Sequence, residues 1–513
     1  MKLRNVVTWL CFFSALIYGH SLTNQFVYDD EEQIVGNAFI KSLDHFSDFF
    51  TGSTMNNGGT VKLSGIYYRP IMTLTFALQY AAFGLDSFKF HLIQLILCTL
   101  NSILVFFLFR FFIKDTRAFV LACIFLLHPL NTEVTVYAAN LQDVLYVFFG
   151  LSALNFLIWA KLKHIWLVSG LTLFLLLSVL SKESGFLFII FAAVFSVFFE
   201  KRRRLPVVLA CGIVMAIYAF LRIDMAQLTS VDHNISMIGR APLGTRLMTM
   251  PAMLWTYFLN FIFPYKLIIN QQWLVTEFNL TGFFLPLMID GIIVSGMLLY
   301  LIEFKNLKFG FFLLVAGLSL GMHLNFLPLD ATVADRWMYL PIIGLLGMLG
   351  VVTEKVKSSE FKKVLVFILL IALGARAYVR STNWNDGFTL YSHDILLNPQ
   401  STYLQNNLGV ELFRKGQIVE AREHFEKSVE ISPNWDIAWS NLGVARGNFG
   451  DFEKAEKCYL ESMKFGDYYL AHENYGKLLY SQKRFAELRK FLETSLKKFP
   501  NNESLNALAN HIP

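Results

Sequence analysis

Asp29, Asp30 and Glu31 belong to one run of acids that follows the first apolar segment of the chain, residues 6–20. Basic residues precede that segment, so if it crosses a membrane the acids emerge on the outer side. A carboxylate there can accept a proton, but adjacent acids near lipid are unfavourable unless they are paired or used. The cluster therefore indicates either an active site or a solvated loop or helix cap.

Further polar groups lie at the outer ends of other apolar segments. They are His128 with Glu133, continuing to Asp143 without a Lys or Arg; Lys182 with Glu183; Asp335 with Arg336, ahead of Tyr339; and Tyr67 to Pro70, which include Arg69. Each group alone is a weak signal, because ionisable residues at membrane borders often anchor helices. Together they indicate a pocket at the membrane surface that could hold a charged headgroup.

Composition sets the class of the protein. Hydrophobic residues make up 55% of the chain and charged residues only 16%, which is typical of a polytopic membrane protein. Eleven apolar runs are long enough, or nearly so, to span a bilayer. They are residues 6–20, 90–110, 118–130, 143–160, 164–180, 184–199, 205–222, 283–302, 309–327, 337–353 and 362–380. We read the first as a retained signal anchor. Four of the five cysteines lie in apolar stretches, without metal-ligand or disulfide spacing.

Basic residues predict the orientation. They cluster in alternate connections, which by the positive-inside rule are cytoplasmic, and eleven spans then leave the C-terminus outside. The clusters are Arg110, Lys114 and Arg117; Lys161 and Lys163; Lys201 to Arg204; Lys305 and Lys308; and Lys355, Lys357, Lys362 and Lys363. Residues 246–263 and 71–83 are expected to be re-entrant or interfacial helices, because an extra span at 246–263 would put basic loops outside.

After residue 380 the chain becomes polar and repetitive. Gly409, Gly443 and Gly476 recur at intervals of 34 and 33 residues, and small and large apolar residues follow each in register. This spacing is typical of tetratricopeptide repeats, which stack helix pairs into a solenoid. The solenoid could hold a protein segment, or it could merely pack on the membrane domain.

The expected organisation is all-α. Residues 1–380 form a membrane domain with a first outer loop at 21–89, residues 381–400 a linker, and residues 401–513 three repeats in the periplasm or lumen. We expect an integral membrane protein of a bacterial inner membrane or the endoplasmic reticulum, with a cytoplasmic N-terminus.

In these motifs the sequence resembles the transmembrane and tetratricopeptide-repeat-containing O-mannosyltransferases of the glycosyltransferase C superfamily. The matching pieces are Phe26 to Asp30 with Asn37, Tyr68 to Pro70, His128-Pro129 with Thr132-Glu133 and Asp143, Lys182-Glu183, and Asp335 to Pro341. The resemblance implies an inverting enzyme with a polyprenyl-phosphate sugar donor, typically a mannosyl donor, and a catalytic acid in the first outer loop. The family usually has an Arg where this chain has Leu141.

Chemistry assigns roles to these residues. A Ser or Thr hydroxyl is a poor nucleophile at neutral pH, so Asp29 or Asp30 is the candidate general base. A phosphate leaving group needs no general acid, but its developing charge needs fixed cations. For that role we rank Arg336 first. Candidates behind it are Arg69, His128 and Lys182, and supporting roles fall to Glu31, Glu133, Asp143, Glu183 and Tyr339.

The expected partners are the polyprenyl-phosphate sugar, membrane lipid and a protein acceptor held by the repeats, and no nucleic acid. No cofactor is expected to be required; the acids could hold a divalent cation, but a monophosphate donor has no pressing need of one. Three alternatives stay open: a membrane-anchored repeat scaffold, a transporter, for which Asp290 inside a span is the one clear sign, and a transferase of whole lipid-linked glycans.

Overall fold

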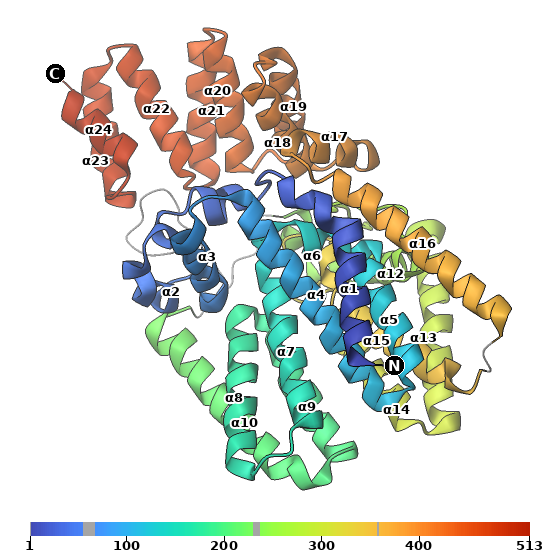
Figure 1. The fold of residues 1–513 in the computed structure, drawn as a ribbon. Helices are drawn as coiled ribbons and strands as arrows, with labels where there is room; N and C mark the ends of the chain where they lie inside the picture. Colours follow the sequence, from blue (N-terminus) through green and yellow to red (C-terminus); the bar gives the residue numbers. More distant parts are fainter. Residues whose placement is uncertain (1, 55–66, 229–235, 357–358, 513) are drawn as a thin grey trace.

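The computed structural model describes residues 2–54, 67–228, 236–356 and 359–512 (Figure 1). Within these residues the chain is all-α, as predicted, and the single β-bridge pairs Gln271 with Val333. A bundle of apolar helices forms the body, and a row of shorter helices lies across its upper end. Residues 55–66 of the predicted first outer loop lie outside the described residues.

Each of the eleven predicted apolar runs contains a helix. They are α1 (Leu3–Tyr18), α4 (Ser87–Phe112), α5 (Asp115–Leu127), α7 (Leu141–Trp159), α8 (His164–Ser181), α9 (Phe186–Phe198), α10 (Arg204–Ala219), α13 (Leu285–Phe304), α14 (Leu307–Gly321), α15 (Pro341–Val352) and α16 (Glu360–Thr382). Among the described helices, seven are long and apolar enough to cross a membrane, or eight if one pair bent by 53° is a single span. The protein is a multi-pass membrane protein, and the count of eleven crossings stays a prediction.

The interior of the bundle is tightly packed. A Cβ on Gly344 of α15 would lie only 2.4 Å from the backbone nitrogen of Ala316 in α14, so only glycine lets these two helices approach so closely. Tyr339, just before α15, is buried and accepts a hydrogen bond of 3.0 Å from the side chain of Asn101 in α4. This hydrogen bond pairs two buried polar groups across helices.

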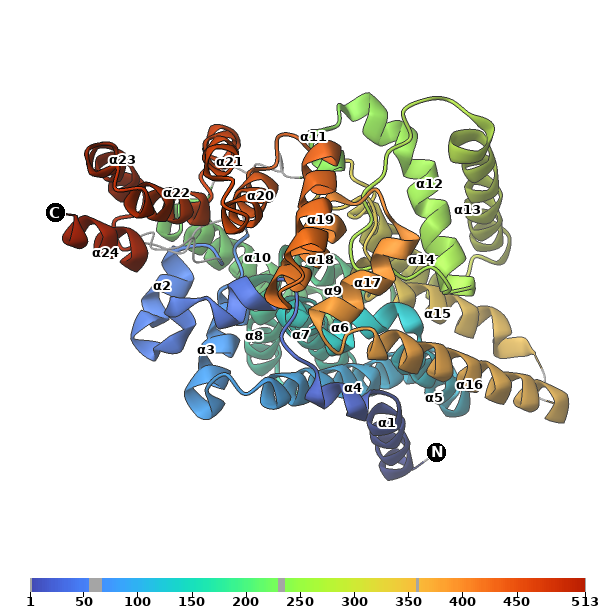
Figure 2. The same cartoon turned by 90° about the horizontal axis from the view of Figure 1, so that it is seen from above.

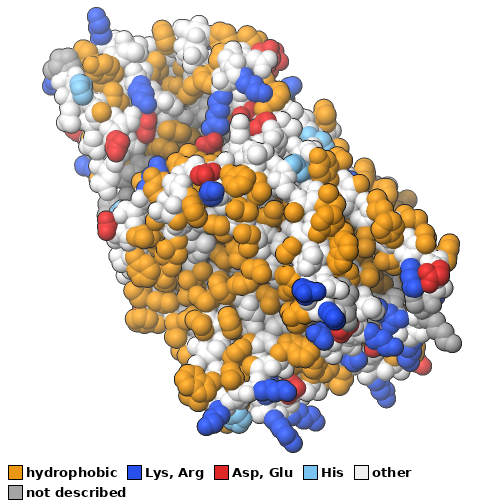
Figure 3. Space-filling model, viewed as in Figure 1, with side chains coloured by type: hydrophobic (Ala, Val, Ile, Leu, Met, Phe, Trp, Pro, Cys, Tyr) orange, Lys and Arg blue, Asp and Glu red, His pale blue; other side chains and the backbone are white. Residues whose placement is uncertain are grey.

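Charge divides the two ends of the bundle. Figure 3 shows an apolar band around the body, with Lys and Arg gathered at the end opposite the row of short helices. The basic connections α4–α5, α7–α8 and α9–α10 lie at that end in Figure 1. This distribution is the one that the positive-inside rule expects of a membrane protein.

Two further helices occupy the apolar stretches expected to be re-entrant or interfacial. Helix α3 (Pro70–Phe83) begins with its proline in the first turn, where the missing N–H has no helical partner to lose. Helix α12 (Leu243–Ile262) contains Pro251 and packs against α13. That α3 and α12 are re-entrant or interfacial helices stays a prediction.

The row of short helices is a solenoid of antiparallel pairs. After α17 (Gly387–Leu397), the helices are α18 (Thr402–Arg414), α19 (Ile418–Ile431), α20 (Asp436–Asn448), α21 (Phe452–Phe465), α22 (Tyr469–Ser481), α23 (Phe485–Lys498) and α24 (Glu503–His511). A Cβ on Gly409 would lie 2.7 Å from the ring of Phe425, and one on Gly443 would lie 2.6 Å from Tyr459. The repeated glycines therefore allow each pair to close. Seen from above, the solenoid arcs from the end of α16 toward α2 (Phe46–Thr51) (Figure 2).

A buried ion pair ties the solenoid to the bundle. Arg380 at the end of α16 donates two hydrogen bonds, of 2.7 and 3.0 Å, to Asp394 of α17, and both side chains are fully buried. Removing either partner would leave an unpaired buried charge, which typically costs about 3–5 kcal/mol. The stretch 381–400, expected to be a linker, thus includes a helix that is firmly held.

Candidate active site

The acidic loop after α1 places its two aspartates differently. Both carboxylate oxygens of Asp30 accept backbone hydrogen bonds, one from Val27 at 2.9 Å and one from Ala139 at 2.5 Å, and the residue has no exposed surface. Ala139 lies far along the sequence, just before α7. Asp30 therefore pins the loop to the bundle, and its oxygens are not available to an acceptor hydroxyl.

Asp29 is only half-buried, lies near the Tyr137 hydroxyl and is close enough to Arg336 for that charge to act on it. Burial raises the pKa of Asp29, and the positive charge of Arg336 opposes that rise. The preceding residue, Tyr28, has a φ of 58°, a left-handed conformation that is unfavourable for a tyrosine. The loop is thus strained next to the one aspartate that remains accessible, and such strain often accompanies functional sites.

Arg336 is the best-placed cation of the site. It lies in a short 3-10 helix (Asp335–Met338), and one guanidinium nitrogen, Nη1, contacts Glu133 at 2.7 Å and the carbonyl oxygen of Ile269 at 3.3 Å. Its Nη2 lies 3.7 Å from Asp330. A guanidinium carries five N–H donors, so donors remain for a ligand after these contacts.

Two more buried cations come from neighbouring segments. Lys182 contacts Asp143 at 2.6 Å, and Arg69 contacts Glu183 at 3.3 Å, with Arg222 on the other oxygen of Glu183 at 3.6 Å. Burial lowers the pKa of Lys182, Asp143 opposes that change, and the charges of Arg69 and Arg336 lower it further. These mutual effects indicate that Lys182, Arg69 and Arg336 are near enough for their charges to act on one another; that they form a phosphate-binding pocket stays a prediction.

Three other candidates have contacts with other parts of the protein, and a role for them in the site stays a prediction. His128 uses both ring nitrogens on backbone groups, since Nδ1 accepts from Leu130 at 3.3 Å and Nε2 lies 3.0 Å from the carbonyl oxygen of Phe261. Tyr339 lies in the core described above. Glu31 pairs with Arg414 of the solenoid at 3.4 Å. These side chains have structural contacts, and none is included in the donor site proposed below.

Several residues of the site give no clear signal in the sequence. Tyr137 has a buried hydroxyl without a hydrogen-bond partner among the described residues, yet its place could not be inferred before the fold was known. Arg222 is a single cation at the end of an apolar run, which is a weak but usable signal. Asp330 and Asn270 lie in polar loops that resemble ordinary connections.

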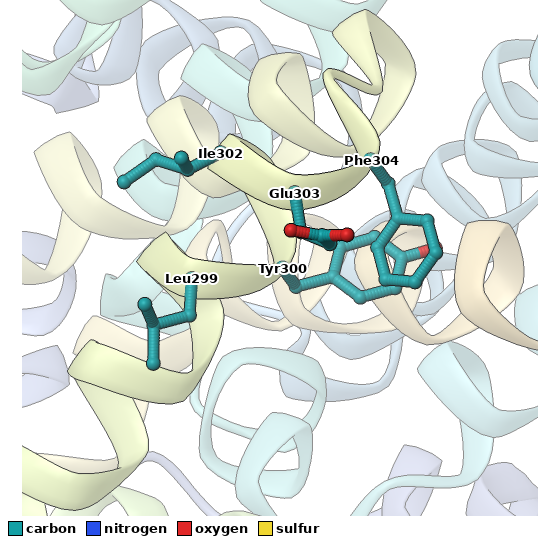
Figure 4. Close-up of a pocket in the computed structure, with 5 residues that line it drawn as sticks. All are labelled: Leu299, Tyr300, Ile302, Glu303 and Phe304. Carbon is teal, nitrogen blue, oxygen red and sulfur yellow. The ribbon is translucent and has the colours of Figure 1, made fainter.

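Within the described residues, no three His, Cys, Asp or Glu side chains are arranged to share a metal ion. That no cofactor is required stays a prediction. A shallow pocket of about 350 Å³ lies elsewhere, at the C-terminal end of α13 (Figure 4). Leu299, Tyr300, Ile302, Glu303 and Phe304 line it. This lining lacks the paired cations of the candidate site, so we assign the pocket no role.

Comparison with known proteins agrees with this description. A tetratricopeptide repeat family model matches residues 402–435. The protein O-mannosyl-transferase F38B6.6 of Caenorhabditis elegans is 27% identical over 468 residues, which cover 85% of this chain and 64% of that protein. The chain is therefore similar in sequence to protein O-mannosyl-transferases over most of its length. Human protein O-mannosyl-transferase TMTC3 is 22% identical, with 86% of this chain and 53% of that protein covered.

The chain thus spans between about half and two thirds of the length of these relatives. Among solved structures it is similar to ArnT from Cupriavidus metallidurans, crystallised with undecaprenyl phosphate. That match has a TM-score of 0.41 and 13% identity over 88% of this chain and 80% of that one.

Proposed function

We propose that this protein is a membrane mannosyltransferase that moves mannose from a polyprenyl phosphate to Ser or Thr hydroxyls of a protein acceptor. Its curated relatives are named protein O-mannosyl-transferases, which supports the sugar and the protein acceptor. The observation that carries the proposal is that an accessible carboxylate, Asp29, lies within reach of the charge of the buried Arg336 guanidinium, which Glu133 holds at 2.7 Å. The Asp29 carboxylate can take a proton from the acceptor hydroxyl, and the Arg336 guanidinium can stabilise the phosphate leaving group.

The reaction is a single displacement. Asp29 accepts the hydroxyl proton while the acceptor oxygen forms a bond to the anomeric carbon. The bond from that carbon to the phosphate oxygen breaks, and the electron pair leaves with the polyprenyl phosphate. Arg336, Arg69 and Lys182 offset the charge that develops on the phosphate. Attack from the face opposite the leaving group inverts the anomeric configuration.

The arrangement of the modules supports an outer-face reaction. The solenoid contacts the acidic loop, because Arg414 of α18 pairs with Glu31, and it lies at the end of the body opposite the basic connections (Figure 3). In our proposal the N-terminus and basic loops are cytoplasmic. The repeats of 401–513 hold the acceptor outside, and the donor lipid stays in the bilayer beside the domain of residues 1–380.

A transfer assay tests the proposal. Purified full-length protein is incubated with radiolabelled mannose on polyprenyl phosphate, glucose on the same lipid, or GDP-mannose, together with a Ser- and Thr-containing acceptor protein. We expect label on the acceptor only with mannosyl polyprenyl phosphate, and none when every Ser and Thr of the acceptor is replaced by Ala. Transfer from GDP-mannose alone would contradict the proposed donor. In a parallel incubation with a lipid-linked oligosaccharide, transfer of the whole glycan would favour the glycan-transferase alternative.

A further inference from the structure

A loop between α12 and α13, residues 267–273, connects the parts of the candidate site; we call it the bridging loop. Its Gln271 forms the only β-bridge among the described residues. The Gln271 N–H donates to the Val333 carbonyl at 3.1 Å, and the Gln271 carbonyl accepts from the Thr332 N–H at 2.9 Å. The Thr332 hydroxyl also donates to the Trp273 carbonyl at 2.7 Å. Since residues 332–333 lead directly into Arg336, the loop and this cation are held as one unit.

Asn270 of the bridging loop reaches the acidic loop. Its side-chain amide donates to the Tyr28 hydroxyl at 3.2 Å, and its oxygen accepts from Gln272 at 2.8 Å. Asn270 is 2% exposed, so its polar groups depend on these partners. Gln272 in turn donates to the backbone carbonyl of Asp330 at 2.8 Å. The orientation of the Asn270 amide is thereby fixed from both sides.

Tyr28 is the residue whose backbone is strained, and it directly precedes Asp29. A left-handed φ of 58° is unfavourable for a bulky residue and persists only where the surroundings hold it. The hydrogen bond from Asn270 is a direct restraint on the Tyr28 side chain. Without it, relaxation of this backbone would move the Asp29 carboxylate.

The same loop also touches Arg336 and the base of the solenoid. The Ile269 carbonyl accepts from Arg336 at 3.3 Å, and the Ile269 N–H donates to Asp394 at 2.9 Å. One short stretch of backbone therefore lies between the base, the phosphate-binding cation and the buried pair of Asp394 with Arg380.

We propose that Asn270 is a positioning residue that, through Tyr28, fixes the Asp29 carboxylate relative to Arg336. The inference rests on the proposed function and deepens it. Asn270 touches neither the donor nor the transferred proton in this account. Its role is geometric, and misplacing a reacting group by about 1 Å can cost about 100-fold in rate.

A double-mutant cycle tests this role with Asn270→Ala, Tyr28→Phe and the two combined. Each single variant should lower kcat for mannose transfer about 10-fold or more, with the KM for mannosyl polyprenyl phosphate changed less than about twofold. If the two residues act through their hydrogen bond, the double variant should be no slower than the slower single variant. The matched control is Asn260→Ala, because Asn260 is equally buried but donates only to the Lys266 carbonyl.

Three outcomes would overturn the inference: rate losses that multiply in the double variant, a matching rise in donor KM, or an equal loss in Asn260→Ala. If a thermal-unfolding assay shows that Asn270→Ala does not fold, the same kcat and KM measurements on Tyr28→Phe, which removes only one hydroxyl, test the inference. The Asp29→Asn variant distinguishes a failure of the positioning role from a failure of the proposed chemistry. If it is inactive while Asn270→Ala and Tyr28→Phe turn over normally, only the positioning role is wrong. If it transfers mannose normally, the assignment of Asp29 as the base is wrong, and if the wild type transfers no mannose, the proposed function itself is wrong.

Discussion

The two adjacent aspartates should fail in opposite ways when each is replaced by asparagine. Asp30 accepts a backbone N–H on each oxygen, at 2.9 and 2.5 Å, in a fully buried place. Asparagine has only one acceptor oxygen, and its amide group would face the second N–H. A buried N–H left without an acceptor gives about 1–3 kcal/mol of destabilisation. The accessible Asp29 has no comparable backbone bonds to lose, so Asp29→Asn should leave stability within about 0.5 kcal/mol.

Activity should show the reverse order. Removing the general base should lower kcat about 10²- to 10⁴-fold in Asp29→Asn, while donor binding is retained. Asp30→Asn should keep a kcat per folded molecule within a few-fold of the wild type. The assay pairs thermal unfolding in detergent with single-turnover mannose transfer, normalised to folded protein. A stable but inactive Asp30→Asn, together with an active Asp29→Asn, would refute the assignment of the base.

Three other predictions follow from the site. Arg336→Lys keeps the charge but loses the planar fork of donors, so the donor KM should rise about 10- to 100-fold, measured by initial rates; an unchanged KM would remove Arg336 from the donor site. Transfer should fall with decreasing pH as Asp29 is protonated, with a midpoint above the ordinary carboxylate range because its folded pKa is raised, and Asp29→Asn should lack this acid limb. Deleting residues 401–513, which retains the Arg380 to Asp394 pair, should slow transfer to a folded protein about 100-fold but transfer to a short peptide only slightly; equal losses would make the repeats structural.

Local patterns in the sequence were sufficient to locate the helices of this fold. Hydropathy located a helix in every predicted apolar run, because apolar length is itself the requirement for crossing a bilayer. The spacing of Gly409 and Gly443 predicted the helix pairs, since each glycine admits the ring of the partner helix. The length of the individual helices could not be predicted as well. Helices α9, α14 and α15 are shorter than a simple span, because tertiary packing decides where a helix ends.

The site depended on contacts that no local pattern encodes. Asp29 and Asp30 are adjacent and chemically identical, and one of the contacts that distinguish them comes from the N–H of Ala139, more than a hundred residues away. Histidine is a residue type that often binds ligands, yet both ring nitrogens of His128 already contact backbone groups, the Phe261 carbonyl and the Leu130 N–H. The amide side chains of the bridging loop are ordinary in the sequence, and their role becomes visible only in the fold, where the loop contacts Tyr28 and Arg336.

The stereochemistry of the transferred sugar tests the central claim most directly. A mannosyl polyprenyl phosphate of defined anomeric configuration is given to the purified protein with an acceptor, and NMR spectroscopy determines the configuration of the new linkage. A single displacement with Asp29 as base predicts mannose on a Ser or Thr oxygen with the configuration inverted. Retention of configuration, or release of mannose without any linkage to the acceptor, would contradict the account.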